Sequence, residues 1–295
     1  PEVETIRRSL EPKLIGQTVR AVLLRRRDIV VAAGDPFGGF ARQRGPADGR
    51  AEPRALDHAD LLQGATVIAL RRLGKQLALI GAPSDESNPH QLALTIQLGM
   101  SGQLIHCSAD EPIPDPRHTH AEWALDNGRL LFRDPRRFGG LRTFCSVEAL
   151  DEHWRALGPD ALTLSRPQLA RGLAHSDRAV KAALLDQSVV AGIGNIYADE
   201  ALFDAGIRPR RLCAKLSPAD IVALTRSIRK VLRSSIRCGG STLRDYVDGR
   251  GRRGSYQLTH AVYGRTGEPC IRCGRCLTTA QVAQRTTVWC ATCQA

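Results

Sequence analysis

Residues 270–293 read CIRCGRCLTTAQVAQRTTVWCATC, and they decide the fold of the end of the chain. Four of the cysteines form two C-x2-C pairs that are separated by 16 residues. Each pair fits a tight turn that can chelate one side of a tetrahedral ion, and thiolates suit Zn²⁺ through their charge and softness. Two redox dithiols would not explain this paired spacing. The pattern therefore predicts one structural Zn²⁺, with these ligands: Cys270, Cys273, Cys290 and Cys293.

The segment between the two pairs carries two further residues of interest. Cys276 is an extra thiol close enough in sequence to compete for the metal. Arg285 lies where a two-stranded finger would turn, so it is either a phosphate contact or a solvated loop charge.

The charge of the chain favours a polyanionic partner. Its 295 residues include 42 Lys and Arg against 30 Asp and Glu, a net charge of +12. Residues 237–295 alone hold nine arginines, no lysine and three acidic residues. Arginine without lysine favours bidentate contacts to phosphate and base edges, and bound phosphates release counterions. With no apolar run of membrane-spanning length and no signal peptide, we expect a cytosolic protein with reduced thiols.

The first half of the chain reads as a β-rich domain that follows a helix. Residues 3–15 repeat apolar side chains at a helical period, although Pro12 is expected to kink this helix. Strand-like segments then run from 64 to 144, and the last two flank a hairpin turn signal at Asn127-Gly128.

The second half of the chain changes to a helical period. The start of its last helix is well defined, because Ser217 is a good N-cap and Pro218 suits the first helical position. Gly239-Gly240 then ends it. The predicted helices cover residues 147–156, 166–174, 179–187, 197–205 and 217–237.

Two stretches are predicted to be loops. Residues 33–60 are rich in Gly, Pro, Arg and Asp without periodicity, which indicates a loop or surface insertion. Residues 241–257 are Gly- and Arg-rich and are predicted to be mobile.

Six motifs occur along the chain in the same order as in a known protein family. They are PEVETIRR, LGMSGQL, DPRRFGG, GIGNIYADEALFDAGI, VYGR-x-GEPC and AQR, and together they resemble the formamidopyrimidine-DNA glycosylase family from beginning to end. The resemblance implies an α+β protein: an N-terminal β-sandwich with a leading helix, a helix–two-turn–helix domain and a four-cysteine zinc finger. The corresponding domains are predicted at residues 1–157, 158–257 and 258–295.

The resemblance also implies an activity. Such enzymes perform base-excision DNA repair: they remove oxidised purines (8-oxoguanine, formamidopyrimidines) from duplex DNA and cleave the strand by β,δ-elimination. An N-terminal amine attacks the sugar; in general an α-amino group has a pKa of about 8, well below about 10.4 for lysine, so more of it than of a lysine amine is unprotonated at neutral pH. The implied partner is double-stranded DNA with a damaged base or abasic site. We expect a monomer of bacterial type in the cytoplasm, associated with the nucleoid and not with membrane.

Family roles carry over to single residues through the matching motifs. In the catalytic machinery, Pro1 matches the nucleophile, Glu2 the proton shuttle, Lys75 a phosphate-contacting lysine that aids catalysis, and Arg285 the finger arginine. Met100, Arg136 and Phe138 match the residues that fill the gap left by an extruded nucleotide. The remaining DNA-binding residues are predicted to be His118, Asn195 and Arg178.

Two positions depart from the family pattern. The family begins PELPEVET, so Pro1-Glu2 align with its second Pro-Glu, and we expect three residues to be missing ahead of Pro1. If the chain begins at Pro1, its secondary amine and Glu2 still offer the right chemistry, but displaced. At a phosphate position that is usually Lys this chain has Ser176, for which Arg178 or Lys181 is expected to compensate.

Two other functions fit parts of the sequence. An endonuclease VIII-like glycosylase would share the fold and act on oxidised pyrimidines, but LGMSG, DPRRFGG and the loop at 241–257, which resembles a lesion-capping loop, favour the purine-directed branch. A catalytically inactive DNA-binding homologue would result if the N-terminus is truly truncated. The mass of the intact mature protein discriminates between an active and an inactive start.

Overall fold

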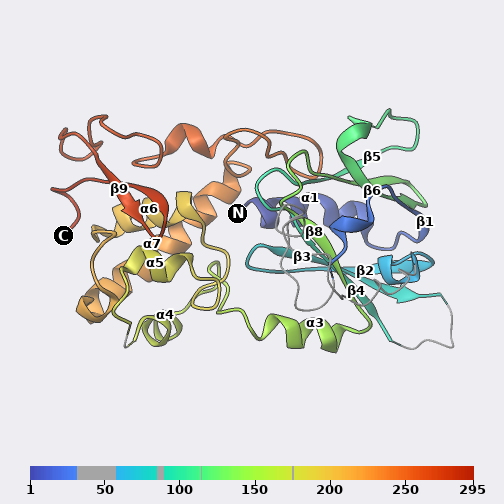
Figure 1. Cartoon of the computed structure of the whole chain (residues 1–295), viewed down its shortest axis with the longest axis horizontal. Coiled ribbons are helices and arrows are strands. Elements are labelled where there is room, and N and C mark those ends of the chain that lie inside the picture. The colour runs from blue at the N-terminus through green and yellow to red at the C-terminus, as the bar shows by residue number, and fades with distance from the viewer. Residues whose placement is uncertain (32–57, 85–89, 114, 175) are drawn as a thin grey trace, which may run out of the picture. The chain divides into compact units, whose positions relative to one another are not determined.

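The computed structural model describes residues 1–31, 58–84, 90–113, 115–174 and 176–295 (Figure 1). Most of the predicted loop at 33–60 lies outside these residues, and its end, from residue 58, enters a short 3-10 helix, η2 (His58–Leu61). Within the described residues, no helix combines the length and apolar character that crossing a membrane requires.

Packing divides the chain into two units. The strand unit contains residues 2–154 together with 241–254, and the helical unit contains residues 155–240 and 255–295 together with Pro1. Residues 241–254 therefore pack with the β-rich half, although they follow the helical segments in the sequence. The predicted division into three domains stays a prediction.

The strand unit is built from two four-stranded antiparallel sheets. The first has the order β2-β3-β4-β8 and the second β1-β6-β7-β5. The β6–β7 hairpin confirms the turn signal at Asn127-Gly128, since Leu125 pairs with Gly128. The strands are β1 (Val19–Leu24), β2 (Ala65–Leu73), β3 (Gln76–Pro83), β4 (Leu92–Gln97), β5 (Gln103–Cys107), β6 (Thr119–Leu125), β7 (Gly128–Arg133) and β8 (Gly140–Phe144).

One hydrophobic core joins the two sheets and the leading helix α1 (Glu2–Leu14). The helix contributes Ile6, Leu10 and Leu14, which share one face at the predicted period and are fully buried. Leu79 of the first sheet and Trp123 of the second belong to the same core. The helix runs through Pro12 into its last turn. The predicted sandwich with a leading helix is thus confirmed.

Besides its passage from β1 to β2, the chain crosses between the sheets at two neighbouring points. It passes from β4 to β5 and later from β7 back to β8. Because β4 pairs with β8 and β5 pairs with β7, the two crossing loops leave adjacent strands at the same edge. LGMSG occupies the first loop, and DPRRFG fills the second.

The helical unit has a hydrophobic core of its own, into which its helices bury their apolar faces. Ser217 caps the longest helix with a full capping box, as its sequence predicted. The helix predicted at 197–205 begins two residues earlier, so Asn195 is its first residue. The helices are α3 (Val147–Trp154), which belongs to the strand unit, and α4 (Arg166–Leu173), α5 (Val180–Leu185), α6 (Asn195–Ala205) and α7 (Pro218–Arg237).

The four-cysteine segment forms a two-stranded hairpin of β9 (Thr278–Val282) and β10 (Arg285–Trp289). Ala283 and Gln284 make its turn, both with positive φ (49° and 58°). Non-glycine residues in this conformation carry strain of roughly 1 kcal/mol each. Arg285 therefore follows a tight, strained turn. The predicted α+β class with a terminal finger is confirmed.

Candidate functional site

Asp134 holds the two crossing loops of the strand unit together. Its carboxylate, 1% exposed, accepts a hydrogen bond from Ser101 Oγ (2.5 Å) and another from the Gly139 amide (2.7 Å). Ser101 Oγ also accepts from the backbone amide of Arg136 (3.2 Å). A buried carboxylate with several donors is a rigid anchor. The sequence analysis identified both motifs but did not predict a role for Ser101 or Asp134. The available signal was a serine and an aspartate inside glycine-rich motifs.

Close backbone approach brings the predicted gap-filling residues to one place. Gly99 has φ +62°, and a Cβ there would lie 2.7 Å from the carbonyl carbon of Phe138. Only glycine therefore fits at this contact. Met100 next to it is 65% exposed, and Phe138 is half-buried. The prediction that Met100 sits at an exposed tip is confirmed.

Arg136 and His118 are each paired with an aspartate. Arg136 Nη2 lies 3.1 Å from a carboxylate oxygen of Asp245, in the segment 241–254. His118 Nδ1 lies 2.5 Å from a carboxylate oxygen of Asp115. Both pairs are partly exposed, so water or a phosphate can exchange for either partner at little cost.

Lys75 occupies the tip of the β2–β3 hairpin. Leu73 pairs with Gln76, which leaves Gly74 and Lys75 as a two-residue turn. Gly74 takes positive φ (58°), the conformation that the first position of a type II′ turn requires. The Lys75 residue is exposed. The hairpin thus presents a lysine at a defined point rather than along a strand face.

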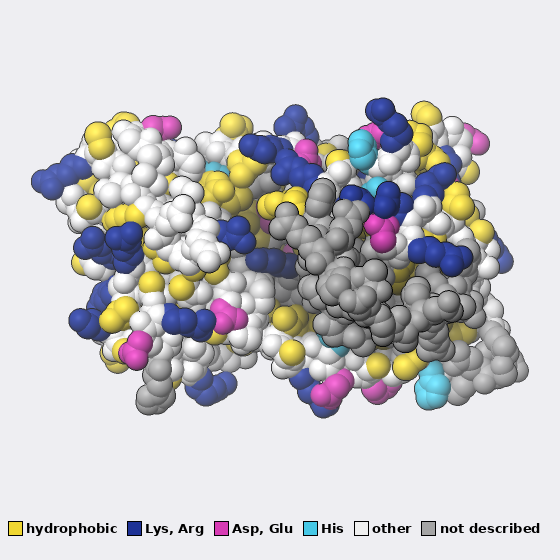
Figure 2. All heavy atoms as spheres, viewed as in Figure 1, with side chains coloured by type: hydrophobic (Ala, Val, Ile, Leu, Met, Phe, Trp, Pro, Cys, Tyr) yellow, Lys and Arg dark blue, Asp and Glu magenta, His cyan; other side chains and the backbone are white. Residues whose placement is uncertain are grey.

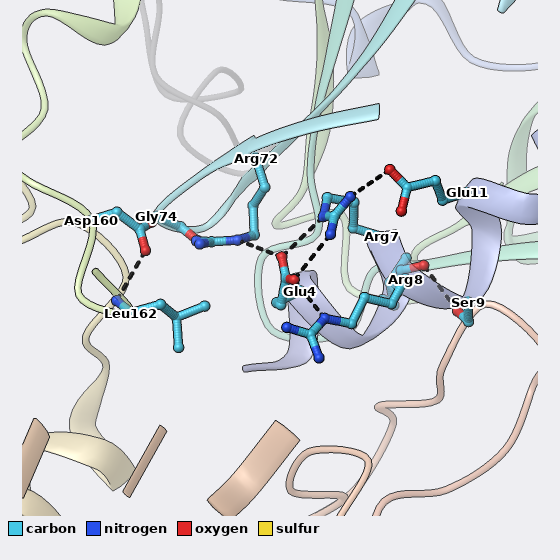
Figure 3. A network of polar contacts seen from close by, with 10 residues as sticks. Glu4, Arg7, Arg8, Ser9, Glu11, Arg72, Gly74, Asp160 and Leu162 are labelled. Carbon is cyan, nitrogen blue, oxygen red and sulfur yellow. Dashed lines mark hydrogen bonds and ion pairs between the residues drawn. The ribbon is translucent and has the colours of Figure 1, made fainter. Parts of the chain in front are cut away.

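A buried carboxylate on α1 is joined to this hairpin through Arg72 (Figure 3). Glu4, 6% exposed, accepts four hydrogen bonds of 2.7–3.1 Å from three guanidinium groups, those of Arg7, Arg8 and Arg72. Arg72 also donates from Nη1 to the carbonyl of Gly74 (2.9 Å). The carboxylate therefore has every acceptor site filled.

Glu4 should make the stability of the strand unit sensitive to acid. Burial raises the pKa of its carboxyl, but hydrogen bonds from Arg7 and Arg8 and the charges of Arg7 and Arg72 outweigh burial and lower the pKa from 4.5 to about 2. A lowered folded-state pKa stabilises the fold fully above pH 4.5, and this stabilisation is lost as the pH falls towards 2. Glu4→Gln should cost about 3 kcal/mol at pH 7 and much less at pH 2.5. Urea unfolding at both pH values measures this difference; an equal cost at both would contradict it.

Glu2 and Pro1 lie at the start of α1. The Glu2 carboxylate accepts from the Ser241 amide (3.1 Å), and its carbonyl accepts from the Tyr246 hydroxyl (3.5 Å). The segment 241–254 is therefore tied to the first turn of α1. Pro1 precedes this helix and is half-buried.

The four predicted cysteine ligands of the finger meet at one point. Their Sγ atoms all lie within 4.8 Å of one another; Cys270 and Cys293 are 4.0 Å apart, and Cys273 and Cys290 are 3.5 Å apart. Tetrahedral bonds from zinc to sulfur, each about 2.3 Å long, would separate the sulfurs by about 3.8 Å. The group is therefore a metal site. Cys276, the predicted competitor, is exposed and not part of it.

Two side chains of the helical unit hold β10 next to Arg285. Asn195 Nδ2 and Lys181 Nζ both donate to the Thr286 carbonyl, at 3.0 and 3.2 Å. Lys181 also lies 2.6 Å from Asp199, and both side chains are fully buried. Arg285 itself is exposed. The structure thus brings the predicted Asn195 and Arg285 segments together.

Burial changes the ionisation of this pair. It lowers the pKa of Lys181 and raises the pKa of Asp199 to about 6, while their mutual attraction opposes both shifts. Lys181 cannot compensate for Ser176 at a phosphate, because its ammonium group has no access to solvent. Of the two residues expected to compensate, Lys181 is therefore excluded, because helix packing buries it against Asp199. Arg178 remains exposed and lies 2.9 Å from Asp186.

Glu200 is a second buried acid of α6 that sequence reasoning missed. Its carboxylate accepts from three successive amides, those of Ala261, Val262 and Tyr263, at 2.8–2.9 Å. Val262 and Tyr263 begin the motif VYGR-x-GEPC, which leads into the finger, and Ala261 immediately precedes it. Asp199 accepts on its other oxygen from the amide of Val288 in β10. The available signal was two adjacent acids flanked by apolar residues within α6.

Positive charge is prominent on the described surface. On the face shown in Figure 2, dark blue Lys and Arg side chains are more conspicuous than acidic ones. This agrees with the net charge of +12 and suits contact with phosphates.

Family models match three consecutive parts of the chain. The formamidopyrimidine-DNA glycosylase N-terminal domain matches residues 1–141, its H2TH domain matches 157–247, and the zinc finger found in FPG and IleRS matches 267–295. The fold and the site therefore define a DNA-repair protein with a finger. The chain belongs to the formamidopyrimidine-DNA glycosylase family, and it is a DNA glycosylase of base-excision repair.

Curated relatives and solved structures resemble the chain over its whole length. It is 40% identical to the formamidopyrimidine-DNA glycosylase of Xanthomonas oryzae and 37% identical to that of Desulfitobacterium hafniense, each comparison covering 100% of this chain and 98% of the relative. The Thermus thermophilus MutM (FPG) structure matches with a TM-score of 0.78 and 37% identity, covering 100% and 97%. A Lactococcus lactis Fpg complex with DNA containing an abasic site matches with 0.80 and 30%, covering 100% and 98%.

Proposed function

We propose that the protein removes oxidised purines, 8-oxoguanine and formamidopyrimidines, from duplex DNA and then cleaves the strand. The observation that carries this proposal is the Ser101–Asp134 anchor, which presents Met100, Arg136 and Phe138 together from two adjacent loops. An exposed Met, a half-buried Phe and an Arg can occupy the gap behind an extruded nucleotide. The curated relatives are formamidopyrimidine-DNA glycosylases, which favours this activity over the endonuclease VIII-like alternative.

The chemistry would begin at an N-terminal proline amine, the role that the family motif gives to Pro1. Its attack on the sugar C1′ expels the damaged base, and the sugar ring then opens at the C1′–O4′ bond, which leaves an iminium between protein and sugar and a hydroxyl at C4′. The iminium acidifies a C2′ proton, whose removal eliminates the 3′ phosphate, and a second elimination releases the 5′ phosphate. Glu2 would shuttle protons, and Lys75 would contact the phosphate near the lesion. His118, Asn195, Arg178 and Arg285 would bind the DNA backbone.

The finger would hold one structural Zn²⁺. Four thiolates at tetrahedral separations fit this ion by charge, softness and geometry. When bound, the metal supplies a fixed crosslink, and the hairpin residues then present Arg285. We further propose a monomer that acts in the bacterial cytoplasm at the nucleoid.

Borohydride trapping tests the proposed function. Reduction of the iminium should join the protein covalently to a duplex that contains 8-oxoguanine, and not to an undamaged duplex. Peptide mapping should place the crosslink on the N-terminal amine. A Lys75→Ala variant should still form the crosslink if this amine, and not the lysine, is the nucleophile. Tight binding of the duplex without trapping or nicking would favour the catalytically inactive homologue.

Two substitutions should separate backbone binding from lesion extrusion. Arg285→Ala should lower the salt slope of duplex binding by about one unit, because one phosphate contact is lost. Phe138→Ala should slow single-turnover excision more than it weakens binding, since the gap behind the flipped base is left unfilled. Arg275→Ala, which removes another exposed finger arginine, is the control. If Phe138→Ala excises at the normal rate, Phe138 is only a packing residue.

A further inference from the structure

A side chain of the same hairpin holds the peptide that leads into Lys75. The Gly74 carbonyl belongs to the planar Gly74–Lys75 peptide, so fixing this oxygen also fixes the amide and Cα of Lys75. Arg72 Nη1 donates to the Gly74 carbonyl at 2.9 Å. In a two-residue turn there is no slack elsewhere to absorb a rotation of this peptide.

The same guanidinium is anchored at its other edge to α1. Arg72 Nε donates to Glu4 at 3.0 Å, and both side chains are nearly buried, 11% and 8% exposed (Figure 3). Arg7 and Arg8 hold the Glu4 carboxylate in turn. A planar, forked guanidinium can serve two acceptors in fixed directions, whereas an ammonium group is a point charge on a flexible stem.

Glu4 lies two residues after Glu2 within the first turn of the same helix. One continuous chain of short contacts therefore joins the start of α1 to the hairpin tip: helix backbone, Glu4, Arg72 and the Gly74 carbonyl. Ordinary strand packing does not require it, because Leu73 and Gln76 already close the hairpin.

We propose that Arg72 is a positioning residue for the glycosylase reaction, which sets the position of Lys75 relative to the first turn of α1. This inference rests on the proposed role of Lys75. Arg72 touches neither DNA nor a reacting atom in this role; it acts through the Gly74–Lys75 peptide.

The neighbouring arginine provides a matched control. Arg71 lies on the same strand, and successive strand side chains point to opposite faces. Its guanidinium pairs with Asp151 (2.6 Å) and stacks over Trp154 (5.1 Å to the ring centre). Arg71→Lys and Arg72→Lys are thus the same chemical change at adjacent positions, and only the second touches the Lys75 turn.

The test is a double-mutant cycle on the full-length protein with a duplex that contains one 8-oxoguanine. Arg72→Lys should lower the single-turnover excision rate roughly 10- to 100-fold, the cost of a misplaced catalytic group, while the Kd for undamaged duplex changes less than about threefold. Arg71→Lys should leave both unchanged. In a Lys75→Ala background, Arg72→Lys should have no further effect on the rate.

Different failures have different meanings. A normal rate for Arg72→Lys, or an equal loss with and without Lys75, would overturn the positioning role. If Lys75→Ala alone excises at the normal rate, the proposed role of Lys75 fails, and this inference fails with it. If Arg72→Lys does not fold by circular dichroism, Glu4→Gln takes its place: the amide keeps the shape but weakens the hold on Arg72, and Lys75→Ala should mask its effect too.

Discussion

Removal of the metal is expected to abolish duplex binding by this protein. The finger packs in only a small core, in which Leu277 and Val288 join Phe203 of α6. Segments of this size do not fold on apolar burial alone, and metal binding supplies their folding free energy. Without the ion, four thiol groups would occupy positions within 4.8 Å of one another. Arg285 would then lose its fixed position after the strained turn.

Chelation followed by an equilibrium binding assay measures this effect. The metal-free protein should show no duplex binding at protein concentrations about a hundredfold above the original Kd. Circular dichroism should show that the strands of the strand unit persist. Cys290→Ser should behave like the chelated protein. Cys276→Ser should keep both metal and binding, because Cys276 lies outside the ligand group. Undiminished affinity in a metal-free sample would refute the role of the finger.

Lys181→Met should destabilise the helical unit by about 3–5 kcal/mol, the usual cost of breaking a buried ion pair. The substitution would leave the Asp199 carboxylate buried without a counter-charge. It would also remove donors to the Thr286 carbonyl and the Thr287 hydroxyl in β10. The hairpin that carries Arg285 should therefore loosen, and duplex binding should weaken as well.

Urea unfolding of the variant tests this prediction. Lys230→Met is the control: Lys230 also pairs with an aspartate, Asp204, at 2.6 Å, but its side chain is 66% exposed, so its loss should cost less than about 1 kcal/mol. A double variant, Lys181→Met with Asp199→Leu, should recover much of the stability, since an apolar pair can replace a buried ion pair. Equal losses for Lys181→Met and Lys230→Met would contradict the argument.

Several features could be predicted from the sequence because they depend on local patterns. The C-x2-C spacing defined the ligand group, Ser217 and Pro218 defined the start of α7, and Asn127-Gly128 defined a hairpin. Motif resemblance predicted the family. The start of α6 was placed two residues late, since Asn195 was interpreted as a residue before the helix and not as its first residue.

The sequence by itself determined the elements, the metal ligands and the family, because each of these is encoded in short spacings and in motifs. Only the tertiary structure decided which distant residues meet. Sheet order places the Met100 loop beside the Arg136 and Phe138 loop, since β4 pairs with β8 and β5 with β7. Helix packing buries Lys181 against Asp199, which no pattern around Ser176 could indicate. Such partners depend on long-range packing, and local periodicity specifies a face but not the residue that covers it.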